Sequence, residues 1–366
     1  MYSDADLQAA VTAGALSPQE AQKFRDYMAT TAGTPAVDEE HFRLLTGFND
    51  IFVSIAAMIL LVAVGWIGNS IPPRIDVDGP SIFGGLFVAA TAWGLAEFFT
   101  RKRRMALPSI LLLLAFVGGV LAATGTSLVL AFGEETFRDN ERAGTLVLAA
   151  SAAVAAIAAW LHWKRFRVPI TIAAGVTTLV GLVLALIAYA VGTENEVLLR
   201  NVLLGFALLL GIGVFLFAMW WDASDPKRLT RRSDVAFWLH LLAAPLIVHP
   251  IFSLLGLTDG SATALEAVIV LLVYVVLGLT ALATDRRALL VSALAYVLWA
   301  LSDLFERFGA VELSFALTAL VIGSALLLLS AFWHTARRAV VTPLPAGVQS
   351  KLPLVDRVAV SPQPAS

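Results

Sequence analysis

"RKRRMALPSILLLLAFVGGVLAATGTSLVLAF", residues 101–132, decides the fold class of this chain. Four basic residues and one methionine are followed by 27 residues that contain no charged side chain. A helix of about 20 apolar residues crosses the ~30 Å hydrocarbon core of a bilayer, and basic residues mark the cytoplasmic end of such a helix. This stretch therefore predicts a transmembrane helix that starts at the cytoplasmic face.

The composition of the whole chain has the same character. Of its 366 residues, 59% are hydrophobic and only 14% are charged, whereas a soluble domain carries roughly 25% charged residues. The net charge of −2 gives no indication of a nucleic-acid partner. The chain has no cysteine, which excludes disulfides, thiolate metal sites and cysteine nucleophiles. We expect an all-α, multi-pass membrane protein whose main partner is the lipid bilayer.

About ten apolar runs are long enough to span a bilayer, and they predict a transmembrane helical bundle. They cover approximately residues 48–68, 81–99, 106–132, 143–163, 168–192, 197–221, 235–256, 264–283, 287–304 and 313–333. With ten spans, 20 of the 25 Lys and Arg residues fall on the side that holds both termini, and 5 fall on the other side. The positive-inside rule then places both termini in the cytoplasm.

Three regions follow from this layout: a cytosolic helical hairpin (1–46), the ten-span domain (47–338) and a proline-rich, disordered cytosolic tail (339–366). In the hairpin, Gly14 breaks the helical pattern. Ser17 and Glu20 then form the two ends of a capping box, with Pro18 at the first helical position. Such a hairpin is too small to bury a core of its own, so we expect it to bind a protein partner, a second copy or the membrane surface.

Spans 1–4 and 7–10 show signs of a parallel internal repeat. Asn49-Asp50 opens span 1 and Ser233-Asp234 opens span 7, and His162 and His334 lie near the ends of spans 4 and 10. Some transporters are built from two such halves with the ligand between them. Alternating topology places basic residues after every even span in any case, so the pattern has two explanations.

The stretch "FWLHLLAAPLIVHPIF", residues 237–252 in span 7, holds the main candidate site. An ionisable residue inside a membrane is costly and is a functional candidate by default. His240 and His249 are nine residues apart, which puts them on opposite faces of a helix and ~13.5 Å apart along its axis. One straight helix therefore cannot offer both to a single metal, and we expect no metal, haem or other cofactor.

The two prolines of this stretch change the backbone. Pro245 and Pro250 remove helical donors, free the carbonyls of Leu241 and Leu246, and predict a kinked or interrupted helix. Free carbonyls at this depth need protein or water around them. Two interpretations stay open: a proton- or ligand-responsive site, or a kinked packing helix whose neutral histidines bond to nearby carbonyls.

Other polar residues lie closer to the expected membrane surfaces. Asn49, Asp50 and Asp234 join the candidate pathway, although helix capping also explains an acidic first turn. Interfacial positions are expected for Glu97, Asp222, His162 and His334, and Asp303, Glu306 and Arg307 are expected to pair with one another where span 9 ends.

Two functional hypotheses lead. A membrane-embedded enzyme comes third, because no phosphate loop, serine elbow, carboxylate cluster, nucleophile or metal set can be named. The first is a transporter or permease-like protein that responds to a proton or a small solute at span 7. The second is a membrane scaffold or sensor whose N-terminal hairpin and tail bind partners.

The blocks "AGALSPQEAQKF", "EEHFRLLTGFNDIFVSIAAMILLVAVGW" and "SDVAFWLHLLAAPLIVHP" resemble those of bacterial inner-membrane families that have no assigned activity. These families pair a short N-terminal helical hairpin with eight or more spans. The resemblance implies a location in the bacterial cytoplasmic membrane and carries over no catalytic residue. Drug/metabolite transporters also have ten spans, but their halves are inverted, whereas a repeat in this chain is parallel.

Overall fold

A computed structural model describes residues 7, 10–31, 48–75, 79–133, 135–138, 140–225, 230–254, 264–287, 289–290, 294, 297–298, 301–302, 305, 314–353 and 355. The chain divides into two compact units, Met1–Leu44 and Leu45–Ser366.

The first unit contains helix α2 (Pro18–Thr31), which starts where the sequence predicted. The backbone N–H of Glu20 donates to Ser17 Oγ at 3.2 Å, and the backbone N–H of Ser17 donates to Glu20 Oε2 at 2.9 Å. Gly14 has a φ of +73°, a left-handed conformation that glycine adopts without steric cost. The predicted capping box and the predicted break before it are both confirmed.

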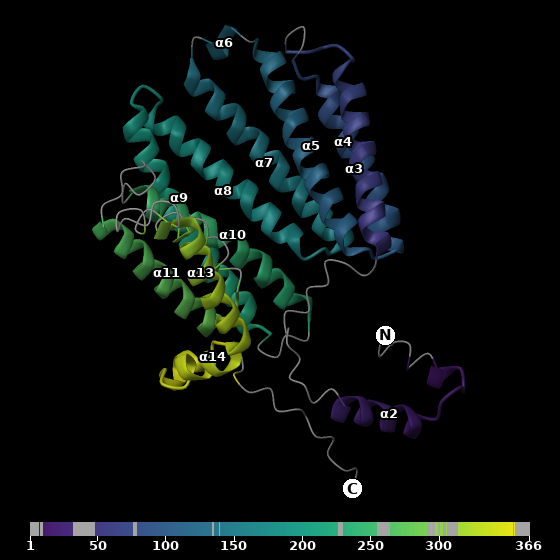
Figure 1. Cartoon of the computed structure of the whole chain (residues 1–366). Helices are drawn as coiled ribbons and strands as arrows, with labels where there is room; N and C mark the ends of the chain where they lie inside the picture. Colours follow the sequence, from purple (N-terminus) through teal and green to yellow (C-terminus); the bar gives the residue numbers. More distant parts are fainter. Residues whose placement is uncertain are drawn as a thin grey trace. The chain divides into compact units, whose positions relative to one another are not determined.

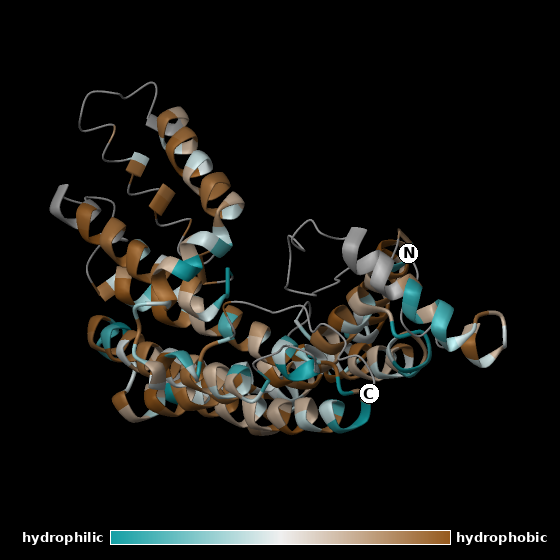
Figure 2. Ribbon diagram, turned by 90° about the horizontal axis from the view of Figure 1, so that it is seen from below, coloured by the Kyte–Doolittle hydropathy of each residue, from teal (hydrophilic) through white to brown (hydrophobic). Residues whose placement is uncertain are grey.

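The second unit is a bundle of apolar helices (Figure 1). Among the described residues, seven helices are long and apolar enough to cross a membrane. They are α3 (Phe48–Asn69), α4 (Ile82–Ala96) with its π-helical continuation η1 (Glu97–Lys102), α5 (Ala106–Phe132), α7 (Glu141–Phe166), α8 (Ile170–Val191), α9 (Glu196–Ala223) and α10 (Arg231–Leu254). Figure 2 shows apolar residues along most of the length of these helices.

The C-terminal part of the bundle corresponds less directly to the ten predicted spans. Helix α11 (Ala264–Thr284) matches the eighth run, and α13 (Ser314–Ala331) matches the tenth. A bend of 77° separates α13 from α14 (Trp333–Val341), and this bent pair counts as an eighth candidate span. The ninth run, 287–304, lies largely outside the described residues, as do Asp303, Glu306 and Arg307.

Helix α10 lies at the centre of the packing. Half of its most apolar window is buried, compared with 22–33% for the other six helices. Val235 and Leu239 pack in a cluster with residues of α8 and α9, Ala244 packs in another with Leu289 and Trp333, and Phe252 packs in a third with Val297. A helix that is apolar on all sides is typical of a bundle interior.

Helix α10 continues from Arg231 to Leu254 through both Pro245 and Pro250, so the backbone is not interrupted there, and the predicted kink stays a prediction. Helix α9 covers the backbone at this point. A Cβ atom at Gly211 would lie 2.9 Å from the carbonyl oxygen of Leu246, the oxygen that Pro250 deprives of its helical donor. Protein therefore packs against this carbonyl, as a hydrocarbon surrounding requires.

The tail begins later than the sequence predicted. Residues 339–341 belong to α14, and Ala346–Gln349 form the short helix α15 directly after Pro345. The Arg337 guanidinium donates to the carbonyl of Pro353 at 2.6 Å. Within the predicted tail, residues 339–353 thus contain the end of α14, a short helix and a side-chain contact to the backbone. Residues 356–366 lie outside the described part of the chain.

Replacing Ser17 with Ala should speed amide hydrogen exchange in the first turn of α2 roughly fivefold, because the cap stabilises these N–H groups. The bonds from Ser17 hold the pKa of Glu20 below its ordinary value. The contribution of Glu20 to the stability of α2 is therefore fully present when the pH is above the ordinary pKa of a glutamate. It is lost as the pH falls through the lowered pKa of Glu20. Exchange measured by mass spectrometry on the full chain checks both effects. Gln19→Ala is the control, and equal exchange in both variants would contradict the capping role.

A neighbouring glycine pair tests the packing of α4 on α5. A Cβ at Gly119 would lie 2.7 Å from the carbonyl oxygen of Gly85, whereas a Cβ at Gly118 meets nothing within 4 Å. Gly119→Ala should lower the free energy of unfolding by about 1–3 kcal/mol through overpacking. Gly118→Ala should leave it unchanged or raise it slightly, because alanine favours a helix. Thermal unfolding in detergent measures both, and equal effects would show that the close contact is unimportant.

Candidate functional site

Three ionisable side chains meet inside the second unit and form what we call the Asp222 cluster: Asp222, His240 and Arg286. Each residue is at most 2% exposed. His240 Nε2 lies 2.9 Å from Asp222 Oδ2. The Arg286 guanidinium donates through Nη2 to Asp222 Oδ1 and through Nε to Asp222 Oδ2, the latter at 3.3 Å. One carboxylate therefore binds both an imidazole and a guanidinium.

Each member of the cluster comes from a different segment. Asp222 lies in the last turn of α9, His240 lies on the buried face of α10, and Arg286 follows α11. Arg286 also donates to the carbonyl oxygen of Ser233 at 3.0 Å, which ties it to the first turn of α10. The ring of Phe215 from α9 packs edge-on against His240, with the ring centroids 5.3 Å apart.

The turn after α11 sends two neighbouring side chains in opposite directions. Asp285 has a left-handed φ of 56°. Its carboxylate accepts a hydrogen bond of 2.7 Å from Trp333 Nε1 and lies 3.7 Å from Arg337 Nε, both on α14. Arg286, the next residue, turns to Asp222 instead. A series of polar contacts thus runs from His240 on α10 to the C-terminal helix α14.

The chemistry of the cluster follows from its charges. An unpaired charge in a low-dielectric interior is strongly disfavoured. The Asp222 carboxylate and the Arg286 guanidinium form a bidentate, charge-assisted pair that largely satisfies this requirement. The imidazole of His240 can gain or lose a proton, and each change alters the net charge around Asp222 by one. The arrangement can therefore hold a proton at His240 next to a carboxylate.

The other histidine of the predicted pair lies elsewhere. His249 is exposed on the surface of the protein, while His240 is fully buried. This difference agrees with the opposite helix faces that their spacing predicted. Pro245 is exposed and Pro250 is buried. The structure thus brings His240, but not His249, into the charged cluster.

The predicted acidic candidates at the helix starts also lie outside the cluster. Asp50 is 3% exposed in the first turn of α3, next to the exposed Asn49. Helix α3 packs on α4 and α5. Asp234 is partly buried in the first turn of α10.

Two residues expected near a membrane surface are also buried within the protein. Asp222 is the centre of the cluster, and His162 is 0% exposed. The His162 ring packs against the aromatic rings of Trp93, Phe116 and Phe166. A count of positions from a helix end ignores neighbouring helices, so it could not predict that both side chains are covered by protein. His334, the proposed repeat partner of His162, is exposed, so their surroundings differ.

Glu97 provides a comparison with Asp222. It lies at the end of a span, as predicted, and its carboxylate binds Arg165 through contacts of 2.6 and 2.9 Å and Arg101 at 3.2 Å. The side chain of Glu97 is 32% exposed, so water shares its charge. Carboxylate–arginine pairs thus occur at the ends of two spans. The Glu97–Arg165 pair is partly exposed to solvent, whereas the Asp222–Arg286 pair is buried. Sequence reasoning missed Asp222, and the one available signal was its complementary charge to Arg286.

No group of three or more His, Asp and Glu side chains within the described ranges has an arrangement that could hold a metal ion.

Asp222→Asn should lower the free energy of unfolding by about 3–5 kcal/mol, because it leaves the Arg286 charge buried without its counter-ion. The double variant Asp222→Asn/Arg286→Gln should be more stable than Asp222→Asn alone, since both charges are gone. Thermal unfolding in detergent measures both, with Glu97→Gln as the matched control of smaller effect. A double variant less stable than Asp222→Asn would contradict this account of the pair.

No protein-family model matches the chain, and neither a curated protein nor a solved structure matches it. The geometry of the Asp222 cluster is therefore the main indication of function in this chain.

Proposed function

We propose that this protein is a multi-pass transport protein of the bacterial cytoplasmic membrane, in which His240 is a proton-responsive element. The observation that carries the proposal is the complete burial of an Asp–His–Arg cluster against the central helix of an apolar bundle. Ionisable groups inside a membrane are costly and commonly belong to proton relays or ion pathways.

The cluster supplies two charge states. With a neutral imidazole, the Asp222 carboxylate and the Arg286 guanidinium balance one another. With a protonated imidazole, two cations share one carboxylate, and the excess positive charge favours a conformation in which water or an anionic solute reaches the site. Protonation of His240 would in this way bias the contacts that join α9, α10 and the segment after α11.

The topology of the proposal is the one that the sequence indicates. It includes about ten spans, both termini in the cytoplasm and a parallel relation between spans 1–4 and 7–10. The acidic residues in the first turns of α3 and α10 support the relation between the two halves, whereas the different surroundings of His162 and His334 speak against extending it to the last span of each half.

Proton flux into proteoliposomes provides the test. Liposomes that contain a pH-sensitive dye and the full-length protein are energised with a potassium gradient and valinomycin between pH 5 and 8. Wild type should admit protons in a pH-dependent manner, and His240→Gln should reduce this flux at least tenfold because the residue can no longer accept a proton. His334→Gln is the control, since this exposed histidine should tolerate the same change.

Two results would overturn the transport proposal: flux no larger than in protein-free liposomes, or equal flux in wild type and His240→Gln. Size-exclusion chromatography and thermal unfolding identify variants that have lost their fold. Asp222→Asn/Arg286→Gln then serves as a second variant, in which the histidine remains but its charged partners are absent.

A sensor or scaffold is the second candidate, and one observation favours it. The contacts that link Asp285 to Trp333 and Arg337 connect the cluster to the C-terminal segment, where Arg337 holds the carbonyl of Pro353. A change at His240 could be passed to this segment and to a partner protein without any transport. In that case wild-type liposomes would show no protein-dependent flux, while His240→Gln would still alter proteolysis of the segment after Pro353.

A further inference from the structure

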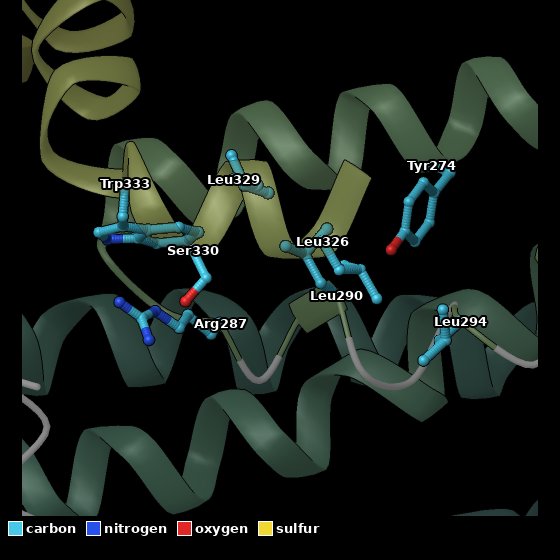
Figure 3. Close-up of a pocket in the computed structure, with 8 residues that line it drawn as sticks. All are labelled: Tyr274, Arg287, Leu290, Leu294, Leu326, Leu329, Ser330 and Trp333. Atoms are coloured by element: carbon cyan, nitrogen blue, oxygen red, sulfur yellow. The ribbon is translucent and has the colours of Figure 1, made fainter. Parts of the chain in front are cut away.

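A separate cavity lies between α11 and α13. A ligand site in this cavity would not require the proposed transport function. Figure 3 shows its lining residues, which come from α11, the segment after it, α13 and the start of α14. Its volume is about 130 Å³. The middle of the cavity is apolar and is formed by Leu290, Leu294, Leu326 and Leu329.

One end of this cavity carries a positive charge. Arg287 lies over the ring of Trp333 at 4.9 Å, and the hydroxyl of Ser330 lies beside it in Figure 3. Within the described part of the chain, no carboxylate lies within ion-pair distance of Arg287. This contrasts with Arg286, its neighbour, which is bound to Asp222. An anionic ligand at this end of the cavity would meet a guanidinium that has no counter-ion among the described residues.

A hydroxyl group lies toward the opposite end of the cavity from Arg287 (Figure 3). Tyr274 of α11 points its hydroxyl toward Leu290 and Leu326 (Figure 3). This oxygen is buried, and no other described residue bonds to it. A buried hydroxyl without a partner costs about 1–3 kcal/mol, so an occupant that offers an acceptor oxygen at this end would be stabilised.

We propose that this cavity binds an anionic glycerophospholipid from the membrane. Its phosphate would lie at Arg287 and Ser330, a guanidinium–phosphate contact of the charge-assisted kind. An ester carbonyl would accept the hydrogen bond of Tyr274, and an acyl chain would follow the four leucines. The basic pair Arg286-Arg287 also belongs to the side of the chain on which the positive-inside pattern predicts the cytoplasm, where anionic headgroups attract arginine.

Native mass spectrometry of the full-length protein tests this assignment. The protein is equilibrated in detergent with equal amounts of palmitoyl-oleoyl phosphatidylglycerol and palmitoyl-oleoyl phosphatidylcholine. Wild type should retain the anionic lipid at least fivefold more than the zwitterionic one. Arg287→Gln should abolish this preference, and Tyr274→Phe should reduce retention of both lipids about twofold because each has ester carbonyls. Ser330→Phe, which fills the polar end without a change in charge, should also reduce retention.

Arg231→Gln is the matched control, because Arg231 is an exposed arginine of another basic cluster. An equal loss of phosphatidylglycerol in Arg231→Gln and Arg287→Gln would overturn the proposal in favour of general attraction to a basic surface. Equal retention of the two lipids by wild type would also overturn it. Displacement of the lipid by millimolar glycerol 3-phosphate would instead indicate a site for a soluble phosphate. Size-exclusion profiles identify any variant that fails to fold, in which case Ser330→Phe and Tyr274→Phe still decide.

Discussion

The pairing of Asp222 with Arg286 and His240 is the interaction on which the centre of the bundle depends. A carboxylate in an apolar interior must be paired or neutralised, and here the partners come from α10 and from the segment after α11. The charge requirement therefore fixes how three stretches of chain, far apart in the sequence, meet. Arg286 strengthens this constraint through its bond to the carbonyl of Ser233.

Close contacts between helix backbones also hold the bundle together. Gly211 allows α9 to approach the carbonyl of Leu246, and Gly85 and Gly119 bring α4 and α5 together in a similar way. Small residues are suited to this role in membranes, where water does not drive helices together and van der Waals packing must. Near Pro250 the same contact has a second effect, because it covers a backbone oxygen that the helix itself cannot satisfy.

The two neighbouring arginines after α11 lie in different surroundings. Arg286 is enclosed and bound to Asp222, whereas Arg287 faces an apolar cavity and contacts a tryptophan ring. Asp285 has a left-handed backbone conformation, and its own carboxylate contacts α14. The next residue, Arg286, turns toward α9 instead. A proton-responsive element on one side of this turn and a lipid site on the other would share one short segment of backbone.

The sequence by itself determined the membrane character, the capping box at Ser17, most span positions and the opposite faces of His240 and His249, since these follow from composition, length and helical periodicity. It did not predict that neighbouring helices bury Asp222 and His162, or that residues 346–349 form a short helix. Only the tertiary structure could decide these points, because burial and pairing depend on which helices are neighbours. A position near a helix end has no fixed depth until adjacent helices cover it, as α10 and Arg286 cover Asp222.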